Sequence, residues 1–334
     1  METLPEIPFA DIRGGTALDL LERFPDTARS LAAAALNTFG FISRAAGAVA
    51  MPLGDHASRN WLARAGNPYL AEIDALAARL GIRGVHFLNV CFEWGCTSGV
   101  WDTTLRRVLD WPFPNLGTHM VVARQSGPAG DYFNITWPGL SGSFQGLAPG
   151  RFAAAINQAP ARKHRAGLAG DWLANRIAVR DETGMPPAHL LRIVFETALD
   201  YDAAKALLRH TRLAVPAIFI LSGTKRGEGC IIERSETEAA VREIDGAAVC
   251  ATNHFETRLN HGGAGWRARP IDSAGRIAAA RALSEPDFAE DFAWFRPPIA
   301  NINSRLAFNA DAASGTLTLI GTNGATPVTQ VFRR

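Results

Sequence analysis

The first part of the chain, to about residue 82, carries apolar side chains at helical spacing. The repeat of three and four residues typical of amphipathic helices runs through TALDLLERF, DTARSLAAAALNTFGFI and NPYLAEIDALAARLG. Asp26 and Asn67 are the expected N-caps of the last two helices, and Gly81 is the expected helix stop. We interpret the apolar stripes as core-packing faces. A transient contact of these helices with a membrane surface remains an alternative.

After Gly84 the pattern changes to short apolar runs. The run GVHFLNVCFEW predicts a buried strand, and more strands are expected at HMVVARQS, DYFNITW, RFAAAIN, PAIFILSG, GCIIERS, AAVCATN and GTLTLIGT. Helices are expected at PAHLLRIVFETA, YDAAKALLRHT and GRIAAARALS, and loops at HRAGLAGDW and NHGGAGWRARP. Strand clusters separated by helical pairs favour packed α and β layers.

Composition narrows the class of protein. The chain has 334 residues, is 47% hydrophobic and 20% charged, and carries a net charge of +2, which is ordinary for a globular protein. Basic residues form no dense run, so no nucleic-acid partner is expected. The N-terminus lacks signal-peptide features, and apolar windows such as LAVPAIFIL are too short to span a bilayer. We therefore expect a cytoplasmic protein with reduced thiols.

The four cysteines differ in their surroundings. No CxxC pair or Cys/His ligand spacing is present, so no metal site is expected. Cys91, Cys230 and Cys250 lie in strand-like runs and are expected in the core, where cysteine commonly lies. Cys96 follows Gly95, whose carbonyl is unhindered, and precedes two hydroxyl residues.

The Gly95–Cys96 bond is suited to attack by the Cys96 thiol on the preceding carbonyl. Such an N-to-S acyl shift, followed by hydrolysis, would free Cys96 as a new N-terminus. A terminal cysteine supplies its own base, because an α-amino group has a pKa of about 7.7–8.0. The alternative is a small, buried structural cysteine.

Polar residues elsewhere in the chain fit this chemistry. Arg107 and Asp110 are three residues apart in RVLDW, and Asn157 and Asn253 each end an apolar run. A surface ion pair and two turn-forming asparagines are the ordinary explanation. Near a nucleophile, Asp110 would hold the terminal ammonium group, while Arg107 would lower the thiol pKa and fix the carboxylate. The asparagines would donate hydrogen bonds to an oxyanion.

Aromatic residues and one histidine complete the candidate site. Trp94, Trp111, Phe113 and Trp137 would line an acyl pocket, or else fill the core. His254 is the rival general base for an unprocessed Cys96, and a hydrogen-bonding role is the expected one.

Taken together, these residues resemble the cysteine N-terminal-nucleophile (Ntn) hydrolases typified by acid ceramidase and N-acylethanolamine-hydrolysing acid amidase. Conjugated bile acid hydrolase and isopenicillin N acyltransferase are more distant relatives. The resemblance runs through LPEIPFADI, FLNVCFEWGCTS, WPGLSGSFQGLAPGRFAAAIN, LDYDAAKALLRHTRLAVPAIFILSGTKRGEGCIIER and ATNHFE. It implies an α+β fold, the αββα sandwich of two stacked antiparallel sheets. Residues 1–95 would be a helical α-subunit, and residues 96–334 the catalytic β-subunit.

The resemblance also implies roles for particular residues. Cys96 would be the nucleophile after cleavage between Gly95 and Cys96, with Arg107 and Asp110 around the amine. Asn253 would contribute to the oxyanion hole. A further candidate, Arg276, lies in DSAGRIAAAR and would support the site.

Some positions differ from the pattern of the ceramidase and amidase branch. Asn157 matches an oxyanion-hole asparagine of the bile acid hydrolase branch. Gln158 stands where the ceramidase and amidase branch has a glutamate. The hairpin after Cys96 looks shortened, and the secretory signal and disulfides of the lysosomal members are lacking.

The function implied is cleavage of a linear amide bond in an N-acyl amide through an acyl-thioester. Neither a metal nor an organic cofactor is needed, and the two fragments would remain associated. Two alternatives stay open: an acyltransferase that uses the same acyl-enzyme, and a catalytically silent homologue that binds lipid or a partner.

Overall fold

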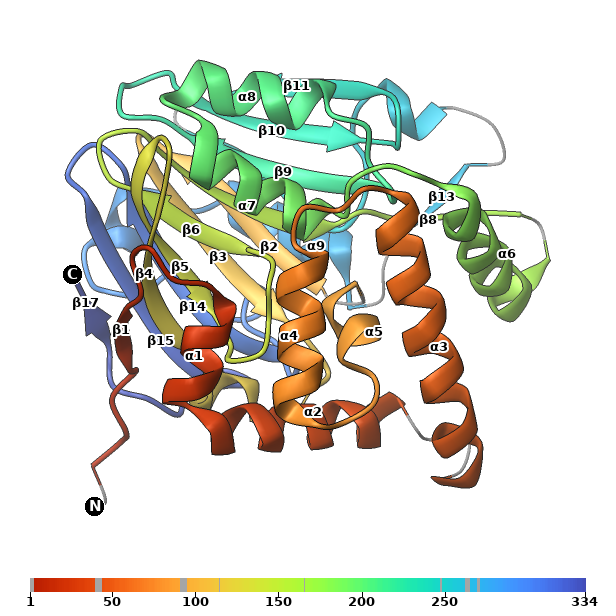
Figure 1. Ribbon diagram of the computed structural model, residues 1–334. Helices are drawn as coiled ribbons and strands as arrows, with labels where there is room; N and C mark the ends of the chain where they lie inside the picture. Colours follow the sequence, from red (N-terminus) through yellow and green to blue (C-terminus); the bar gives the residue numbers. More distant parts are fainter. Residues whose placement is uncertain are drawn as a thin grey trace.

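The computed structural model describes residues 3–39, 44–90, 95–113, 115–164, 166–246, 248–261, 265–268 and 271–334. Within these ranges two β-sheets stack face to face and carry helices on their outer sides (Figure 1). The αββα sandwich predicted from the sequence is therefore confirmed.

The first sheet has eight strands in the described residues. In their order across the sheet they are β1 (Phe9–Asp11), β4 (Val121–Gly127), β5 (Gly130–Thr136), β6 (Gln145–Ala148), β7 (Phe152–Gln158), β9 (Ala217–Ser222), β10 (Gly229–Arg234) and β11 (Ala239–Glu243). Its pairs are antiparallel, except that β1 runs parallel to β4.

The second sheet holds the hairpin that begins at Gly95. Its strands are β12 (Ala248–Ala251), β2 (Gly95–Trp101), β3 (Thr104–Asp110), β14 (Ser304–Asp311), β15 (Thr316–Asn323) and β16 (Thr326–Pro327), with β17 (Phe332–Arg333) also beside β15. A small separate pair is formed by β8 (Ala161–Arg162) and β13 (Trp266–Arg267).

Helices cover both outer faces of the sandwich. The N-terminal helices are α1 (Ala17–Arg23), α2 (Pro25–Phe39), α3 (Arg44–Arg64), α4 (Leu70–Leu80) and α5 (Val85–Asn89). The later helices are α6 (Gly167–Asp181), α7 (Pro187–Thr197), α8 (Tyr201–His210) and α9 (Ser273–Arg281), and short 3₁₀ turns lie at Leu116–Thr118, Arg258–His261 and Glu285–Phe288. Helices α7 and α8 pack on the first sheet, and α9 packs on β2 and β12 of the second.

Burial on both faces explains why the sequences of the central strands are continuously apolar. Both faces of the central strands are covered, so β7 and β9 are buried along their whole length. Leu109, Ile156, Phe219 and Phe308 belong to one apolar cluster, and none is more than 1% exposed. Burying a large apolar side chain stabilises a fold by about 1.5–3 kcal/mol, so this layer holds the sheets together.

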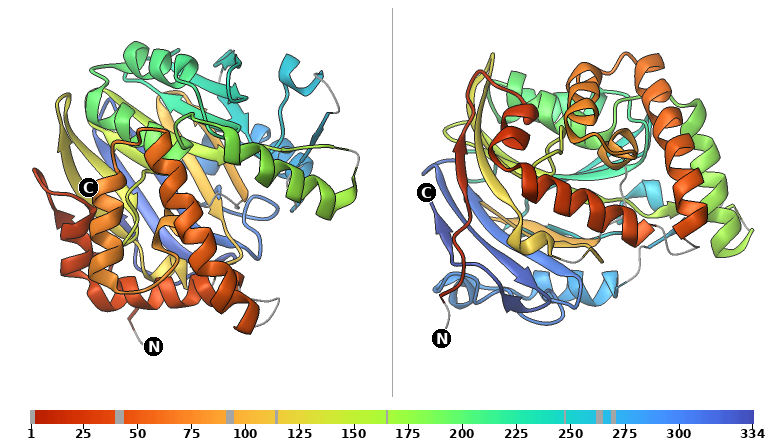
Figure 2. Two further views of the ribbon diagram at one scale, coloured as in Figure 1. Left: turned by 45° about the vertical axis from the view of Figure 1, so that its right-hand side comes forward. Right: turned by 60° about the horizontal axis from the view of Figure 1, so that its bottom comes forward.

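The N-terminal segment lies along one side of the sandwich (Figure 2). The Thr16 and Asp19 side chains form a capping box that starts α1, and Gly81 ends α4 in the left-handed conformation, as predicted. The segment is not only helical, because β1 forms the edge of the first sheet. The expectation of a purely helical segment is wrong on this point, because a three-residue strand is too short for an alternation of apolar and polar residues to be recognised.

Several local predictions were wrong. Residues 85–89, expected as a strand, form helix α5, and residues 91–94 of the same run lie outside the described residues. Part of the expected loop HRAGLAGDW lies in helix α6. Helix α2 begins at Pro25, so Asp26 lies inside its first turn. Asn67 precedes the Tyr69 N-cap of α4 and accepts the Tyr69 N–H.

No helix in the described residues is both long enough and apolar enough to cross a membrane.

Candidate active site

The β2–β3 hairpin fixes the surroundings of Cys96. Its register pairs Gly95 with Asp110, Cys96 with Leu109 and Ser98 with Arg107. Paired residues share a face of the sheet, and alternate residues point to opposite faces. Cys96 and Arg107 therefore face the first sheet, whereas Asp110 faces helix α9.

On the inner face, the Cys96 thiol lies beside a buried cation. Arg107 Nη2 lies 3.0 Å from Cys96 Sγ and donates to the Ile156 carbonyl at 2.6 Å. Both Cys96 and Arg107 are fully buried. Burial raises the pKa of the Cys96 thiol to about 11, although the Arg107 charge acts in the opposite direction. In this environment the Cys96 thiol keeps its proton at neutral pH.

The guanidinium group of Arg107 is only partly satisfied. Among the described residues, no acceptor lies within hydrogen-bonding distance of Arg107 Nε or Nη1. Burial lowers the pKa of this guanidinium, and the thiol raises it again only in part. A cation in this position favours any negative charge that forms on the sulfur.

On the outer face, Arg276 joins the carboxylate to the backbone of the hairpin. Its Nη1 lies 3.3 Å from Asp110 Oδ2 and donates to the carbonyl of Cys96, and its Nη2 donates to Asn253 Oδ1 at 2.9 Å. Ser304 Oγ donates to Asp110 Oδ1 at 2.7 Å. Burial raises the pKa of Asp110, and the charge of Arg276 is the largest opposing influence.

Asn253 contacts the backbone at the expected cleavage site. The Cys96 N–H donates to Asn253 Oδ1 at 2.8 Å, and Asn253 Nδ2 donates to the Gln158 carbonyl at 2.8 Å. A Cβ placed on Gly95 would lie 3.6 Å from both Asn253 Oδ1 and Asp110 Oδ2. The nitrogen of the Gly95–Cys96 bond therefore has one acceptor, Asn253 Oδ1, and the Asp110 carboxylate lies beside Gly95.

Asn157 links three strands. Its Oδ1 accepts from Ser98 Oγ at 2.6 Å, and its Nδ2 donates to the carbonyls of Ala251 and Thr252 at 3.2 Å each. Each hydrogen of this amide thus has a carbonyl acceptor. The geometry gives Asn157 a bridging position between β7, β2 and β12.

The expected contact between Arg107 and Asp110 is replaced by another. Residues three apart on a strand point to opposite faces, so the two side chains lie on different sides of β3. Arg276 from helix α9 supplies the cation beside Asp110. Arg107 instead faces the thiol, as predicted.

The remaining candidates fall into two groups. His254 Nδ1 lies 2.8 Å from Ser273 Oγ and 3.2 Å from Thr252 Oγ1, and neither contact involves the Cys96 sulfur. The structure therefore does not favour a Cys–His pair. Trp94 and Cys91 lie outside the described residues, whereas Cys230 and Cys250 are buried, as expected.

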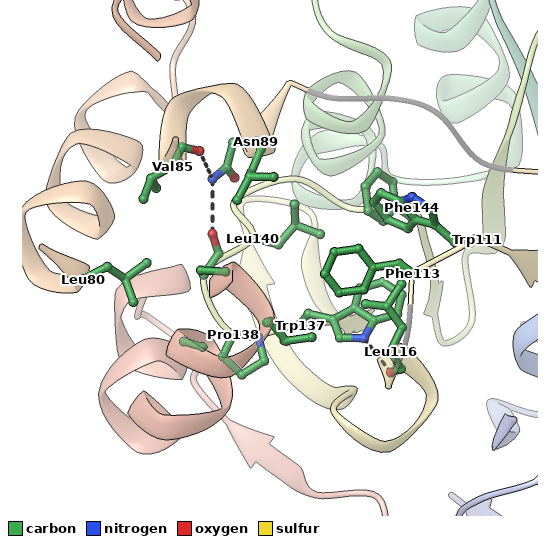
Figure 3. Close-up of a pocket in the computed structure, with 15 residues that line it drawn as sticks. Leu80, Val85, Asn89, Trp111, Phe113, Leu116, Trp137, Pro138, Leu140 and Phe144 are labelled. Carbon is green, nitrogen blue, oxygen red and sulfur yellow. Dashed lines mark hydrogen bonds between the residues drawn. The ribbon is translucent and has the colours of Figure 1, made fainter. Parts of the chain in front are cut away.

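An apolar pocket lies next to this site. It encloses about 700 Å³ of empty space, which includes space open to solvent. It is lined by Ala28, Leu31, Ala32, Leu80, Val85, Leu88, Asn89, Trp111, Phe113, Leu116, Trp137, Pro138, Gly139, Leu140 and Phe144. Trp111, Phe113 and Phe144 gather at one end, and Leu80 and Val85 lie at the other (Figure 3).

Backbone contacts through Ile156 link the aromatic end of the pocket to the thiol. The carbonyl of Phe144 accepts the Ile156 N–H at 2.9 Å, and the Ile156 carbonyl lies 3.9 Å from Cys96 Sγ. Of the aromatic candidates, Trp111, Phe113 and Trp137 do line this pocket.

Sequence reasoning missed several residues that complete the site. Ser304, Ser273 and the carbonyl of Ile156 each contact a candidate residue. Ser273 follows Asp272, the N-cap of α9, and that capping signal is readable in DSAGR. Ser304 and the Ile156 carbonyl carry no such signal. In the described part of the chain, no three His, Cys, Asp or Glu side chains lie together as a metal site would require.

Comparison with known proteins gives one sequence relationship and one shared fold. Acid ceramidase from Homo sapiens is 34% identical over 113 residues, which cover 33% of this chain and 27% of that protein. The Mus musculus protein is 33% identical over 110 residues. The chain thus matches about a quarter of the length of these curated relatives. No family model matches it.

The Caenorhabditis elegans N-acylethanolamine-hydrolyzing acid amidase ortholog has the same fold. Its TM-score is 0.51 at 17% identity, covering 65% of this chain and 93% of that one. A conjugated bile acid hydrolase variant from Clostridium perfringens aligns with a TM-score of 0.43 at 9% identity, covering 72% of this chain and 92% of that one. The resemblance to the acid ceramidase and acid amidase group is confirmed.

Proposed function

We propose that this chain is a self-processing cysteine amidohydrolase that cleaves a linear amide bond of an N-acyl amide. One observation carries the proposal. The buried Cys96 thiol contacts Arg107, while the N–H of the same residue is held by Asn253 and the preceding glycine lies against Asp110. Nucleophile, cation, amide and carboxylate thus surround a single peptide bond.

The proposed maturation step consumes one water molecule. The Cys96 sulfur attacks the Gly95 carbonyl carbon, the carbon–nitrogen bond breaks, and the thiol proton passes to the released Cys96 amine. Water then hydrolyses the Gly95–Cys96 thioester, which leaves a Gly95 carboxylate and a free thiol. Asn253 Oδ1 and Asp110 are the acceptors that would hold the new ammonium group.

The proposed turnover uses the same sulfur. The terminal amine accepts the thiol proton, the thiolate attacks the substrate carbonyl, and the amine returns the proton to the leaving nitrogen. Water hydrolyses the acyl-thioester and releases the acid. Of the two hydrogens on Asn253 Nδ2, one has the Gln158 carbonyl as its partner, so we assign the other to the oxyanion. Asn157 would hold the strands in place instead.

The pocket supports an acyl chain as the part of the substrate that is recognised. No charged side chain lies among its described lining residues, and Phe144 at its aromatic end is hydrogen-bonded to Ile156, whose carbonyl contacts the thiol. The similar proteins include a ceramidase and an N-acylethanolamine-hydrolyzing amidase. An uncharged N-acyl amide with a long acyl chain fits both observations.

The two fragments are proposed to remain together after cleavage. Residues before Gly95 supply one strand of the first sheet and part of the pocket wall. The division at residues 95 and 96, the retained association and the cytoplasmic location all remain predictions.

Mass spectrometry of the purified protein under denaturing conditions tests the maturation step. We expect two fragments that meet between Gly95 and Cys96. Cys96→Ala should give one chain and no turnover, whereas Cys230→Ala, which alters another buried thiol, should still be cleaved. A single chain with full activity would refute the self-processing mechanism.

A panel of N-acyl amides tests the turnover step. Processed protein should release free acid and form a transient acyl-thioester at Cys96. If the acyl group passes to an added amine instead of water, the protein is an acyltransferase. If no acyl-thioester forms with any amide, the protein is a binding homologue and the proposed function is wrong.

A further inference from the structure

The turn formed by residues 137–143 makes one wall of the pocket and is held by side chains from other elements. Asn89 Oδ1 accepts the Ser141 N–H at 2.8 Å, and Asn89 Nδ2 donates to the Gly139 carbonyl at 3.2 Å. Figure 3 shows Asn89 bridging Val85 and this turn. Leu140 and Gly139 line the pocket beside Leu80. The position of this wall thus depends on what holds Ser141.

A buried ion pair also holds Ser141 in place. Arg192 Nη1 on α7 donates to the Ser141 carbonyl at 2.7 Å, and Ser141 Oγ donates to Glu72 Oε1 on α4 at 2.5 Å. Arg192 and Glu72 lie 2.6 Å apart, with side chains only 7% and 10% exposed. The serine is therefore held through both its backbone and its hydroxyl.

The arginine itself has little freedom to move. Arg192 Nε binds Glu196 Oε1 at 2.8 Å, and its guanidinium lies 4.2 Å from the centre of the Tyr69 ring. The Tyr69 hydroxyl donates to the other oxygen of Glu196 at 2.7 Å. Tyr69 and Glu72 both reach this framework from the N-terminal segment, and Glu72 is the one that also binds Ser141.

We propose that Glu72 is a positioning residue that sets the far wall of the acyl pocket through Arg192 and Ser141. This inference rests on the proposed function. Glu72 precedes the proposed cleavage site, whereas Arg192 and Ser141 follow it. The N-terminal fragment thereby shapes a wall that belongs to the catalytic fragment. Because Gly139 of this wall lies beside Leu80, at the end of the pocket opposite Trp111, the position of the wall matters most for substrates with long acyl chains.

Paired substrates test the inference. The processed enzyme and its Glu72→Ala variant would be assayed on a butanoyl and a hexadecanoyl amide of the same amine. The ratio of kcat/KM for the long substrate to that for the short one should fall about tenfold, which corresponds to about 1.4 kcal/mol. The change should lie in KM for the long substrate. Glu72→Gln keeps a carbonyl acceptor and should restore part of the ratio.

The control is Glu22→Ala, another glutamate of the N-terminal helices that is 54% exposed and 3.8 Å from Arg79. It should leave the ratio unchanged. An equal loss on both substrates in Glu72→Ala would show a merely structural role and overturn the inference.

A binding assay separates this inference from the proposed function. Uncleaved Cys96→Ala protein would be titrated with cis-parinaric acid, a fluorescent long-chain fatty acid, with and without Glu72→Ala. We expect Kd to rise about tenfold in the double variant, in line with the activity ratio. An unchanged Kd would refute the positioning role even if no amide is ever hydrolysed.

Discussion

Replacing Arg107 by methionine is expected to stabilise the uncut protein while it destroys the proposed chemistry. Arg107 and Arg276 are both fully buried on opposite faces of one hairpin. Arg276 faces a carboxylate, Asp110, at 3.3 Å. Arg107 faces a protonated thiol and one carbonyl, and two of its nitrogens lack acceptors in the described part of the chain.

The expected changes in the free energy of unfolding have opposite signs. Replacing buried ion pairs by well-packed apolar residues often stabilises a protein, by about 1–4 kcal/mol. Arg107 has no ion pair in the described part of the chain, so Arg107→Met should raise the value by about 1–3 kcal/mol. Arg276→Met should lower it by about 3–5 kcal/mol, because Asp110 would remain buried without its cation. The self-cleavage rate should fall at least about 100-fold in Arg107→Met, since the forming thiolate loses its nearest positive charge.

Chemical denaturation of the two arginine variants would check the stability changes. The background should be Cys96→Ala, so that every molecule is uncut, and mass spectrometry of the variants that retain Cys96 would follow cleavage. Arg281→Met is the matched control, because Arg281 lies on α9 with its side chain 52% exposed. If both buried-arginine variants lose stability equally, Arg107 has an anionic partner and the reasoning is wrong.

Further predictions concern stability. Burial lowers the pKa of His189 from 6.5 to about 3, so between these values only the unfolded chain binds this proton. Lowering the pH from 6.5 should lower the free energy of unfolding by up to about 1.4 kcal/mol per pH unit. Denaturation at several pH values should show a weaker pH dependence of this free energy for His189→Gln. His210→Gln, which replaces an exposed histidine, should leave the pH dependence unchanged. The Glu233 carboxylate accepts two backbone N–H groups, so Glu233→Gln should lower the unfolding free energy by about 1–3 kcal/mol in urea. A Cβ on Gly117 would lie 2.4 Å from a backbone oxygen, so Gly117→Ala should lower the melting temperature. Gly54→Ala in helix α3 has room and should raise the unfolding free energy by about 0.5–1 kcal/mol; the opposite sign for either glycine would contradict the packing argument.

The fold could be predicted where apolar residues recur at helical spacing or where a residue typical of helix ends is present. Helices α7, α8 and α9 follow apolar spacing, and Gly81 marks the end of α4. Helix α5 could not be distinguished from a strand, because a short, continuous apolar run fits both structures. Residues 304–311, which form β14, were not recognised as a strand. Its side chains are buried on both faces, so no alternation of polar and apolar residues marks it.

The sequence predicted which residues gather around Cys96, but not the contacts between them. Cys96, Arg107, Asp110 and Asn253 do come together. Which cation meets Asp110 depends on the face of β3, and the strand period of two would have excluded Arg107 from that role. Arg276 is far from Asp110 in the sequence, so only the packing of α9 on the hairpin brings the two together.

The short strand β1 has a consequence for the order of folding and the proposed self-cleavage. Residues 9–11 close the outer edge of β4, and an unpaired sheet edge readily recruits a second chain. Residues 96–334 produced alone would thus leave the edge of β4 unpaired and should aggregate. In the proposed scheme the chain therefore folds before it is cut, and residues 1–95 would assist the folding of the catalytic part.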